Sequence, residues 1–211
     1  MIWIVSKSGM SAQFLEACIN NEDLTQTNLY ELKQTKCKFG MFTELLYQWE
    51  DEKLPLKVST SIGWRDSFIE GFERARQLGK NALFTHRHEE ELIQWMIKNG
   101  DTIIRLRHVN NYPLWICRES VEDSNNSDEY FVQKLKNRID EQNKLPSYLY
   151  NLPYLDQNDY LTVCIEKLKQ LAPTMDKDIF EKNLKFYMNE NLQGIEDWKS
   201  ILNIMQLYFQ S

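Results

Sequence analysis

The sequence predicts an α/β protein with an open, mainly parallel sheet. Through residues 1–121, short apolar segments with strand character alternate with amphipathic segments, a pattern that favours parallel strands joined by right-handed crossovers. Residues 122–211 have mainly helical periodicity, so we expect a helical C-terminal half of the same domain, packed on that sheet. With 211 residues, 42% of them hydrophobic, and 6 Trp, 10 Tyr and 10 Phe, the chain can bury one sizeable core.

The chain begins with a predicted strand, a small-residue turn and the start of a helix. Ile2–Val5 is an apolar run, Ser6–Ser11 is rich in small residues, and helical spacing follows to about residue 20. Backbone N–H groups and the helix dipole would meet at this turn, where Gly9 permits close approach and Lys7 adds a positive charge. The turn therefore indicates a phosphate or sulfate site. An ordinary capping turn is the alternative, because no Gly-Lys-Ser/Thr triplet completes a Walker motif.

Between this unit and residue 80, the sequence predicts two helices and one strand. Residues 22–38 are polar and show no clear periodicity. The spacing of apolar residues predicts a helix over Met41–Glu50, and strict alternation predicts a strand over Leu56–Ile62. A second amphipathic helix is expected over Arg65–Leu78, and Gly79 is a typical residue to end it.

The same alternation continues to residue 121. We expect strands over Ala82–His86 and Thr102–Leu106, followed by helices over Glu89–Lys98 and Tyr112–Val121. Ligands of such sheets bind beyond the carboxyl ends of the strands. The residues at or after these strand ends with side chains suited to chemistry or anion binding are Ser6, Lys7, Ser8, Gly9, His86, Arg87, His88, Arg107 and His108.

The C-terminal half follows a polar, acidic linker over residues 122–129. Helical periodicity then predicts helices over Tyr130–Gln142, Asp159–Leu171, Asp176–Asn191 and Ile195–Tyr208. The aromatic residues of this half are interpreted as core packing rather than as part of a cofactor site. Residues 206–211 resemble the tail of a protease-cleavage tag, and we assign them no function.

Composition restricts the partners and the location that we expect. A net charge of −6 disfavours binding to nucleic acid or to an anionic membrane surface. No apolar stretch approaches the length of a membrane span, and no signal peptide is recognisable at Met1. The 4 Cys lack C-x-x-C spacing and only 3 His are present, so we expect buried thiols in a reducing cytoplasm and no metal site. Seven of the eight arginines fall between Arg65 and Arg118, which hints at a small anionic ligand.

Three motifs, in this order, resemble the sulfotransferases that use 3′-phosphoadenosine 5′-phosphosulfate (PAPS). The first strand of that family enters a P-K-S-G-T-T-W-like loop, which Val5–Ser11 matches at Lys-Ser-Gly. A Thr-His-x-Pro strand end is matched by Thr85-His86 without the proline, and a later strand ends in an arginine, as Ile103–Arg107 does. The family's serine eight residues after that arginine is replaced by Trp115, and the C-terminal Arg-Lys-Gly loop of its cytosolic members is missing.

The resemblance implies a P-loop-like fold and transfer of a sulfuryl group from PAPS, without a metal, to a hydroxyl or amine of a small-molecule or glycan acceptor. It makes His86 the general base, a role that suits an imidazole, and directs Lys7 to the leaving phosphate. The 5′-phosphosulfate would be held by Ser6, Lys7, Ser8, Gly9, Met10 and Ser11, and the 3′-phosphate by Arg107, with Arg105 and Ser120 as its neighbours.

Two alternatives remain open from the sequence. One is a degenerate P-loop kinase or other nucleotide-binding protein, which would need a magnesium-binding Gly-Lys-Ser/Thr sequence that the loop lacks. The other is a catalytically inactive α/β scaffold whose helical half binds a protein partner. The scaffold predicts that Lys7 and His86 lie far apart, whereas an active site brings them together.

Overall fold

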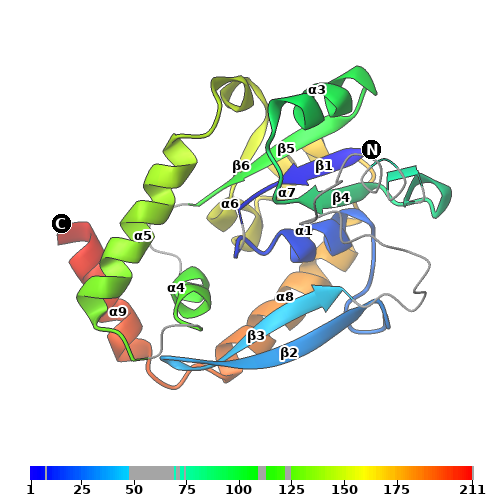
Figure 1. Ribbon diagram of the computed structural model, residues 1–211. Coiled ribbons are helices and arrows are strands. Elements are labelled where there is room, and N and C mark those ends of the chain that lie inside the picture. Colours follow the sequence, from blue (N-terminus) through cyan, green and yellow to red (C-terminus); the bar gives the residue numbers. More distant parts are fainter. Residues whose placement is uncertain are drawn as a thin grey trace.

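A four-stranded parallel sheet, in the order β4-β1-β5-β6, forms the centre of the protein (Figure 1). The computed structural model describes residues 1–7, 9–47, 69, 72–73, 75–108, 113–121 and 125–210. The strands are β1 (Ile2–Val5), β4 (Ala82–Thr85), β5 (Thr102–Arg107) and β6 (Tyr154–Asp156). This arrangement confirms the α/β class and the parallel sheet.

The strand order places a change of direction at β1. The chain leaves β1 for β4 on one side and then returns across it to β5 and β6 on the other side. Ile2 is therefore paired with Ala82 on one flank and with Thr102 on the other. In open α/β sheets such a switch point leaves a crevice beyond the carboxyl ends of the strands, and here the turn after β1 lies at that position.

Each face of the sheet is covered by a different set of elements. Ile2 and Ile4 belong to the larger core, which includes side chains of α1 (Ala12–Ile19) and α8 (Lys177–Gln193). Trp3 and Val5 face the smaller core, which includes side chains of α3 (Glu90–Lys98). The alternation of β1 side chains between two buried faces explains why this strand is apolar throughout.

Three helices stand near the carboxyl ends of the strands (Figure 1). They are α4 (Pro113–Glu119), α5 (Asp128–Asn143) and α9 (Trp198–Gln210). Helix α3 and α4 match the expected helices to within one or two residues, and α5 extends the expected one at both ends. Residues 206–210 continue α9 without interruption.

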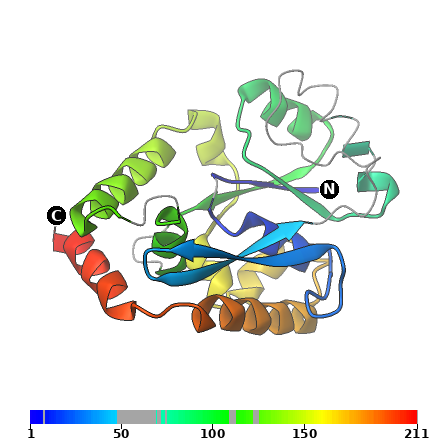
Figure 2. The same cartoon turned by 60° about the horizontal axis from the view of Figure 1, so that its bottom comes forward.

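The helix expected over Met41–Glu50 is wrong, because this segment contains a strand. Strand β3 (Gly40–Tyr47) pairs antiparallel with β2 (Tyr30–Cys37), which occupies the polar segment that showed no periodicity. Figure 2 shows this hairpin lying beside α8. Backbone pairing along eight residues and burial of Phe42 and Leu45 override the local helical spacing.

A glycine fixes the hairpin to the end of α8. Gly40 has a φ of 127°, and a Cβ there would overlap the carbonyl oxygen of Gly194. The next residue, Met41, donates its N–H to that same carbonyl at 2.7 Å. The backbones therefore approach at a distance that no side chain at position 40 would allow.

The C-terminal half differs from the expected all-helical half in two places. Strand β6 pairs with β5, so residues 122–211 supply the fourth strand of the sheet; three residues are too few to show strand periodicity. The helix expected over Asp159–Leu171 is divided into α6 (Gln157–Leu161) and α7 (Ile165–Leu171), because Val163 has a φ of 69°. A 3-10 helix, η1 (Ser147–Asn151), precedes β6.

The strand expected over Leu56–Ile62 lies outside the described residues, as does half of the helix expected over Arg65–Leu78. Within that helix, Phe72 and Ala75 are buried as the spacing predicts. Ring centroids of Phe72 and Trp3 lie 5.5 Å apart in a stacked arrangement. This contact joins the segment to the smaller core.

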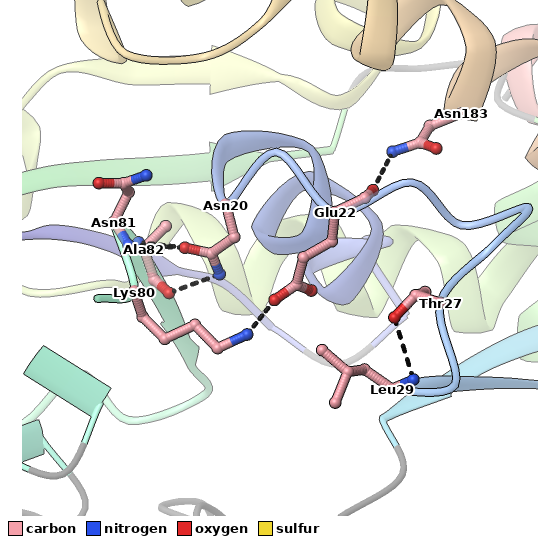
Figure 3. A network of polar contacts seen from close by, with 8 residues as sticks. All are labelled: Asn20, Glu22, Thr27, Leu29, Lys80, Asn81, Ala82 and Asn183. Atoms are coloured by element: carbon pink, nitrogen blue, oxygen red, sulfur yellow. Dashed lines mark hydrogen bonds and ion pairs between the residues drawn. The ribbon is translucent and has the colours of Figure 1, made fainter. Parts of the chain in front are cut away.

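A polar network ties the end of α1 to the start of β4 (Figure 3). Asn20 accepts from the N–H groups of Asn81 and Ala82 at 2.7 and 2.8 Å, and its amide donates to the Ala82 carbonyl at 3.0 Å. Lys80 forms an ion pair with Glu22 beside these bonds. One asparagine thus satisfies backbone groups at the start of β4, which is an edge strand of the described sheet.

The cysteines are free thiols, as expected from their spacing. Cys18, Cys37 and Cys117 are buried and Cys164 is half-buried. Within the part of the chain that the structure describes, no helix combines the length and the hydropathy needed to cross a bilayer.

Candidate functional site

A cavity of about 220 Å³ lies beyond the carboxyl end of β1. Its walls come from the turn between β1 and α1, from β3 of the hairpin, from the end of β4, and from α4 and α8. The crevice expected at the switch point of the sheet is therefore present. One of its walls is formed by the hairpin that the sequence did not predict.

The turn between β1 and α1 exposes the N-terminus of α1 to this cavity. Gly9 has a φ of 86°, and Ser11, the residue before α1, has a left-handed conformation with φ 51° and ψ 34°. The side chain of Ser11 caps no N–H of the helix, and Ala12, Gln13 and Phe14 line the cavity. The first N–H groups of α1 thus remain available to a ligand, which favours an anion.

Side chains of the C-terminal half hold this turn in place. The Tyr160 hydroxyl donates to the Met10 carbonyl, and the Gln142 amide donates to the Met10 sulfur at 3.8 Å. The hydroxyls of Ser11 and Tyr187 are 3.1 Å apart. The conformation of the turn is therefore set by residues far away in the sequence, and Tyr187 also lines the cavity.

His86 lies at the edge of the cavity and is held by the turn. Its Nδ1 is 3.0 Å from the Ser6 carbonyl oxygen, which can only accept, so Nδ1 carries the proton and Nε2 the lone pair. Nε2 has no hydrogen-bond partner among the described residues. Burial lowers the pKa of His86, as does the nearby charge of Lys7, whereas the Ser6 bond raises it. The imidazole is therefore neutral at pH 7 and able to accept a proton.

Arg118 contributes a positive charge from α4. Its Nε forms an ion pair with Oε1 of Glu44 at 2.8 Å, and the two side chains are 28% and 21% exposed. Within the described part of the chain its two terminal nitrogens have no partner, and Arg118 lines the cavity. A Cβ on Gly9 would lie 3.4 Å from the Arg118 side chain, an ordinary contact, so the φ of 86° rather than a lack of space favours glycine there.

The structure brings together some of the predicted site residues. Ser6, Gly9, Met10, Ser11 and His86 meet at the turn or line its cavity. Lys7 is near enough to His86 to lower the pKa of the imidazole. Ser8 lies outside the described residues.

The predicted residues that follow β5 lie elsewhere. Arg105 and Arg107 alternate with Ile104 and Leu106, which belong to the larger core, and so project from the other face of the sheet. They line a second cavity of about 380 Å³. Arg107 forms two bonds with Asp156, at 3.0 and 3.1 Å.

Ser120, the third residue that the resemblance assigns to the 3′-phosphate, is fully buried. Its hydroxyl donates to the Cys117 carbonyl at 2.8 Å. That bond satisfies a carbonyl of the last turn of α4, which is a structural use of the hydroxyl.

Sequence reasoning missed Arg118, Glu44 and Tyr187 as cavity residues. Arg118 belongs to the arginine-rich middle of the chain, and this was the only signal for it. Glu44 lay in a segment expected to be helical, and Tyr187 was interpreted as core packing. Tyr187 is in fact buried against Phe14, with ring centroids 4.8 Å apart, while its hydroxyl reaches the turn.

No protein-family model, curated protein or solved structure matches this chain. The function is therefore argued from the geometry of the cavity and from its chemistry.

Proposed function

We propose that the cavity beside the β1–α1 turn is the active site of a sulfotransferase-like enzyme that moves a sulfuryl group from PAPS to a hydroxyl or amine acceptor. The single observation that carries this proposal is the bond between His86 Nδ1 and the Ser6 carbonyl. It places a neutral imidazole, with Nε2 unpartnered among the described residues, beside a turn that is suited to an anion.

The turn would bind the phosphosulfate in the manner of a P-loop. The uncapped N–H groups of α1 and the ammonium of Lys7 would surround the 5′-phosphate. Arg118 would add the N–H groups of its two terminal nitrogens from α4. As the bond between sulfur and the bridging oxygen breaks, negative charge grows on that oxygen, and donors fixed in advance stabilise it at little cost in reorganisation.

His86 would act as the general base. The acceptor oxygen or nitrogen attacks the sulfur and its proton passes to Nε2, while the S–O bond to the phosphate breaks and the nucleotide leaves with the electron pair. A base whose conjugate acid has a pKa near or below neutrality is already deprotonated at pH 7, which suits this role.

The contact between strand ends also favours this proposal over the inactive scaffold. A scaffold needs no approach of Lys7 and His86, whereas here His86 bonds to the residue preceding Lys7. We leave the 3′-phosphate out of the proposal, because Arg107 already pairs with Asp156 and the Ser120 hydroxyl is used inside α4.

The test is calorimetry with adenosine 3′,5′-bisphosphate. We expect wild-type protein to bind it and Lys7→Ala to bind it at least about tenfold more weakly, because a charge-assisted contact contributes about 1.5–3 kcal/mol. The control is Lys98→Ala, which removes an exposed lysine at the end of α3, away from the cavity. Absence of heat with wild type would contradict the nucleotide assignment, and magnesium-dependent binding of ATP alone would replace it with the kinase alternative.

A further inference from the structure

The second cavity contains a buried cation, Arg105, that has no hydrogen bond or ion pair with the described residues. Arg105 is only 3% exposed, and its guanidinium makes no hydrogen bond or ion pair with any described residue. Its Nε is completely buried and unsatisfied. The rings of Tyr150 and Tyr154 lie 4.8 and 5.6 Å from the guanidinium carbon, and Arg105 lines the cavity of about 380 Å³.

An unpaired guanidinium in this position is costly. Aromatic rings attract a cation, but they do not accept its N–H groups, and a buried charge without a hydrogen-bonding partner destabilises a fold. Asp156 is the carboxylate that lines the same cavity, and Arg107 holds both of its oxygens, at 3.0 and 3.1 Å. Burial lowers the pKa of Arg105, and the charge of Arg107 lowers it further.

We propose that this cavity binds the carboxylate of a small organic acid, with Arg105 as its ion-pair partner. Arginine presents a planar fork that matches a carboxylate in two parallel hydrogen bonds. The unsatisfied, nine-tenths buried side chain that lines the cavity is the observation that points to a ligand.

The charges around the cavity favour a monoanion over a phosphate monoester. Arg107 and Asp156 cancel each other, which leaves Arg105 as one net positive charge in the lining. His108, which also lines the cavity, is half-buried, and loss of hydration lowers its pKa to about 3, so it is neutral at pH 7. One positive charge matches a carboxylate, whereas a phosphate monoester near neutrality carries between one and two negative charges.

The remaining walls suit an apolar body. Ile139 and Leu145 provide apolar surface, Tyr150 provides an aromatic ring, and Gln142 and Asn143 provide amides. We therefore expect an aromatic or short aliphatic monocarboxylate. The inference does not depend on the proposed sulfuryl transfer, because the two cavities share no lining residue.

Calorimetry with sodium benzoate and hexanoate, beside the neutral isostere benzamide, tests this site. We expect wild type to bind at least one of the two carboxylates and to bind benzamide at least about tenfold more weakly than benzoate, because the charge-assisted bonds are lost. Arg105→Gln should lower carboxylate affinity at least about tenfold. The control Arg87→Gln, which removes an arginine paired with the exposed Glu89, should leave the affinity unchanged.

Stability provides a second readout that a purely structural arginine would not give. Arg105→Met should raise the melting temperature of the ligand-free protein, because it removes a buried unpaired charge, and should abolish the rise that the carboxylate causes in wild type. If the Arg105 variants do not fold, the Nε–H signal of Arg105 in the NMR spectrum of wild type should shift on titration with benzoate.

Four results would overturn the assignment: no binding of either carboxylate, equal binding of benzoate and benzamide, undiminished binding by Arg105→Gln, or an Arg105 signal that does not respond. A loss of affinity for adenosine 3′,5′-bisphosphate in Arg105→Gln would also overturn it, by placing a nucleotide phosphate in the cavity. Failure of the proposed function is distinguishable, because Lys7→Ala should leave carboxylate affinity unchanged.

Discussion

The two ends of the parallel sheet use their polar side chains in opposite ways. At the amino end, Asp101 accepts from the indole N–H of Trp3 at 3.0 Å and from the amino group of Met1 at 3.2 Å. At the same end of the sheet, the Asn20 side chain forms hydrogen bonds with backbone groups at the start of β4. These side chains join one element to the next, and their bonds are directed inward.

At the carboxyl end, several donors and acceptors have no partner among the described residues. They are Nε2 of His86, the terminal nitrogens of Arg118 and the guanidinium of Arg105. Polar groups without hydrogen-bond partners beside a cavity reduce the stability of the fold, and they are retained where a ligand supplies the missing partner. The difference indicates that polar groups at the amino end maintain the fold, whereas those at the carboxyl end are left available to a ligand.

The largest expected effect separates catalysis from stability at the carboxyl end. His86→Asn should reduce the rate of sulfuryl transfer about 10²–10⁴-fold, the usual contribution of a general base. The free energy of unfolding, measured with urea, should fall only by the contribution of the lost hydrogen bond to Ser6. The matched control is His88→Asn, because His88 is two residues away and does not line the cavity. Equal losses in both variants would contradict the assignment of the base.

The next effect belongs to the amino end. Asn20→Ala should lower the free energy of unfolding by about 3 kcal/mol, because it removes three hydrogen bonds to buried backbone groups at about 1 kcal/mol each. Nucleotide affinity should not change. Asn203→Ala, which removes one exposed bond to Asp128, should stay within about 0.5 kcal/mol of wild type in the same urea titration.

A pH-dependent effect on stability is expected from His108, a half-buried histidine at the carboxyl end of the sheet. His108 stacks on Trp115 with ring centroids 3.9 Å apart, and burial lowers its pKa from 6.5 to about 3. Below pH 6.5 the unfolded imidazole binds a proton that the folded one does not, so stability falls as the pH decreases towards 3.

Between pH 7 and pH 5 this single residue should account for a loss of about 2 kcal/mol, at about 1.4 kcal/mol per pH unit. His108→Phe keeps a ring beside Trp115 and cannot titrate. Urea unfolding at both pH values should therefore show a smaller difference for the variant, and an unchanged difference would show that His108 is protonated in the folded protein.

The smallest effect concerns Arg118. Arg118→Gln should weaken binding of adenosine 3′,5′-bisphosphate about tenfold, because a charged donor is lost from the cavity. The free energy of unfolding should change by less than about 1 kcal/mol, since the ion pair with Glu44 is partly exposed. If the free energy of unfolding fell and the affinity for adenosine 3′,5′-bisphosphate did not, Arg118 would have a structural role and no role in binding. Lys177→Gln, which removes an exposed ion pair with Glu181 in α8, is the control.

The sequence predicted the elements whose pattern is local. Ile2–Val5, Ala82–Thr85 and Thr102–Arg107 are strands because their apolar runs are buried on both faces, and the alternation with α1 and α3 implied the parallel arrangement. The meeting of the first turn with His86 followed from the same rule, since parallel strands end at one edge.

The elements that were not predicted correctly depend on partners distant in the sequence. The segment Gly40–Tyr47 has helical spacing and becomes a strand because Tyr30–Cys37 pairs with it. Tyr154–Asp156 is too short to show a period, and only its pairing with β5 makes it a strand. Arg118 enters the cavity because the hairpin places Glu44 opposite α4, which no local pattern reveals.

The bonds that hold Met10 and Ser11 have a consequence for the order of events in folding. Their partners, Gln142, Tyr160 and Tyr187, are 132, 150 and 176 residues further along the chain. Contacts of such separation close large loops and form slowly. During synthesis the beginning of the chain therefore leaves the ribosome long before its final shape can be fixed, and the last third of the protein completes a site whose residues were made first.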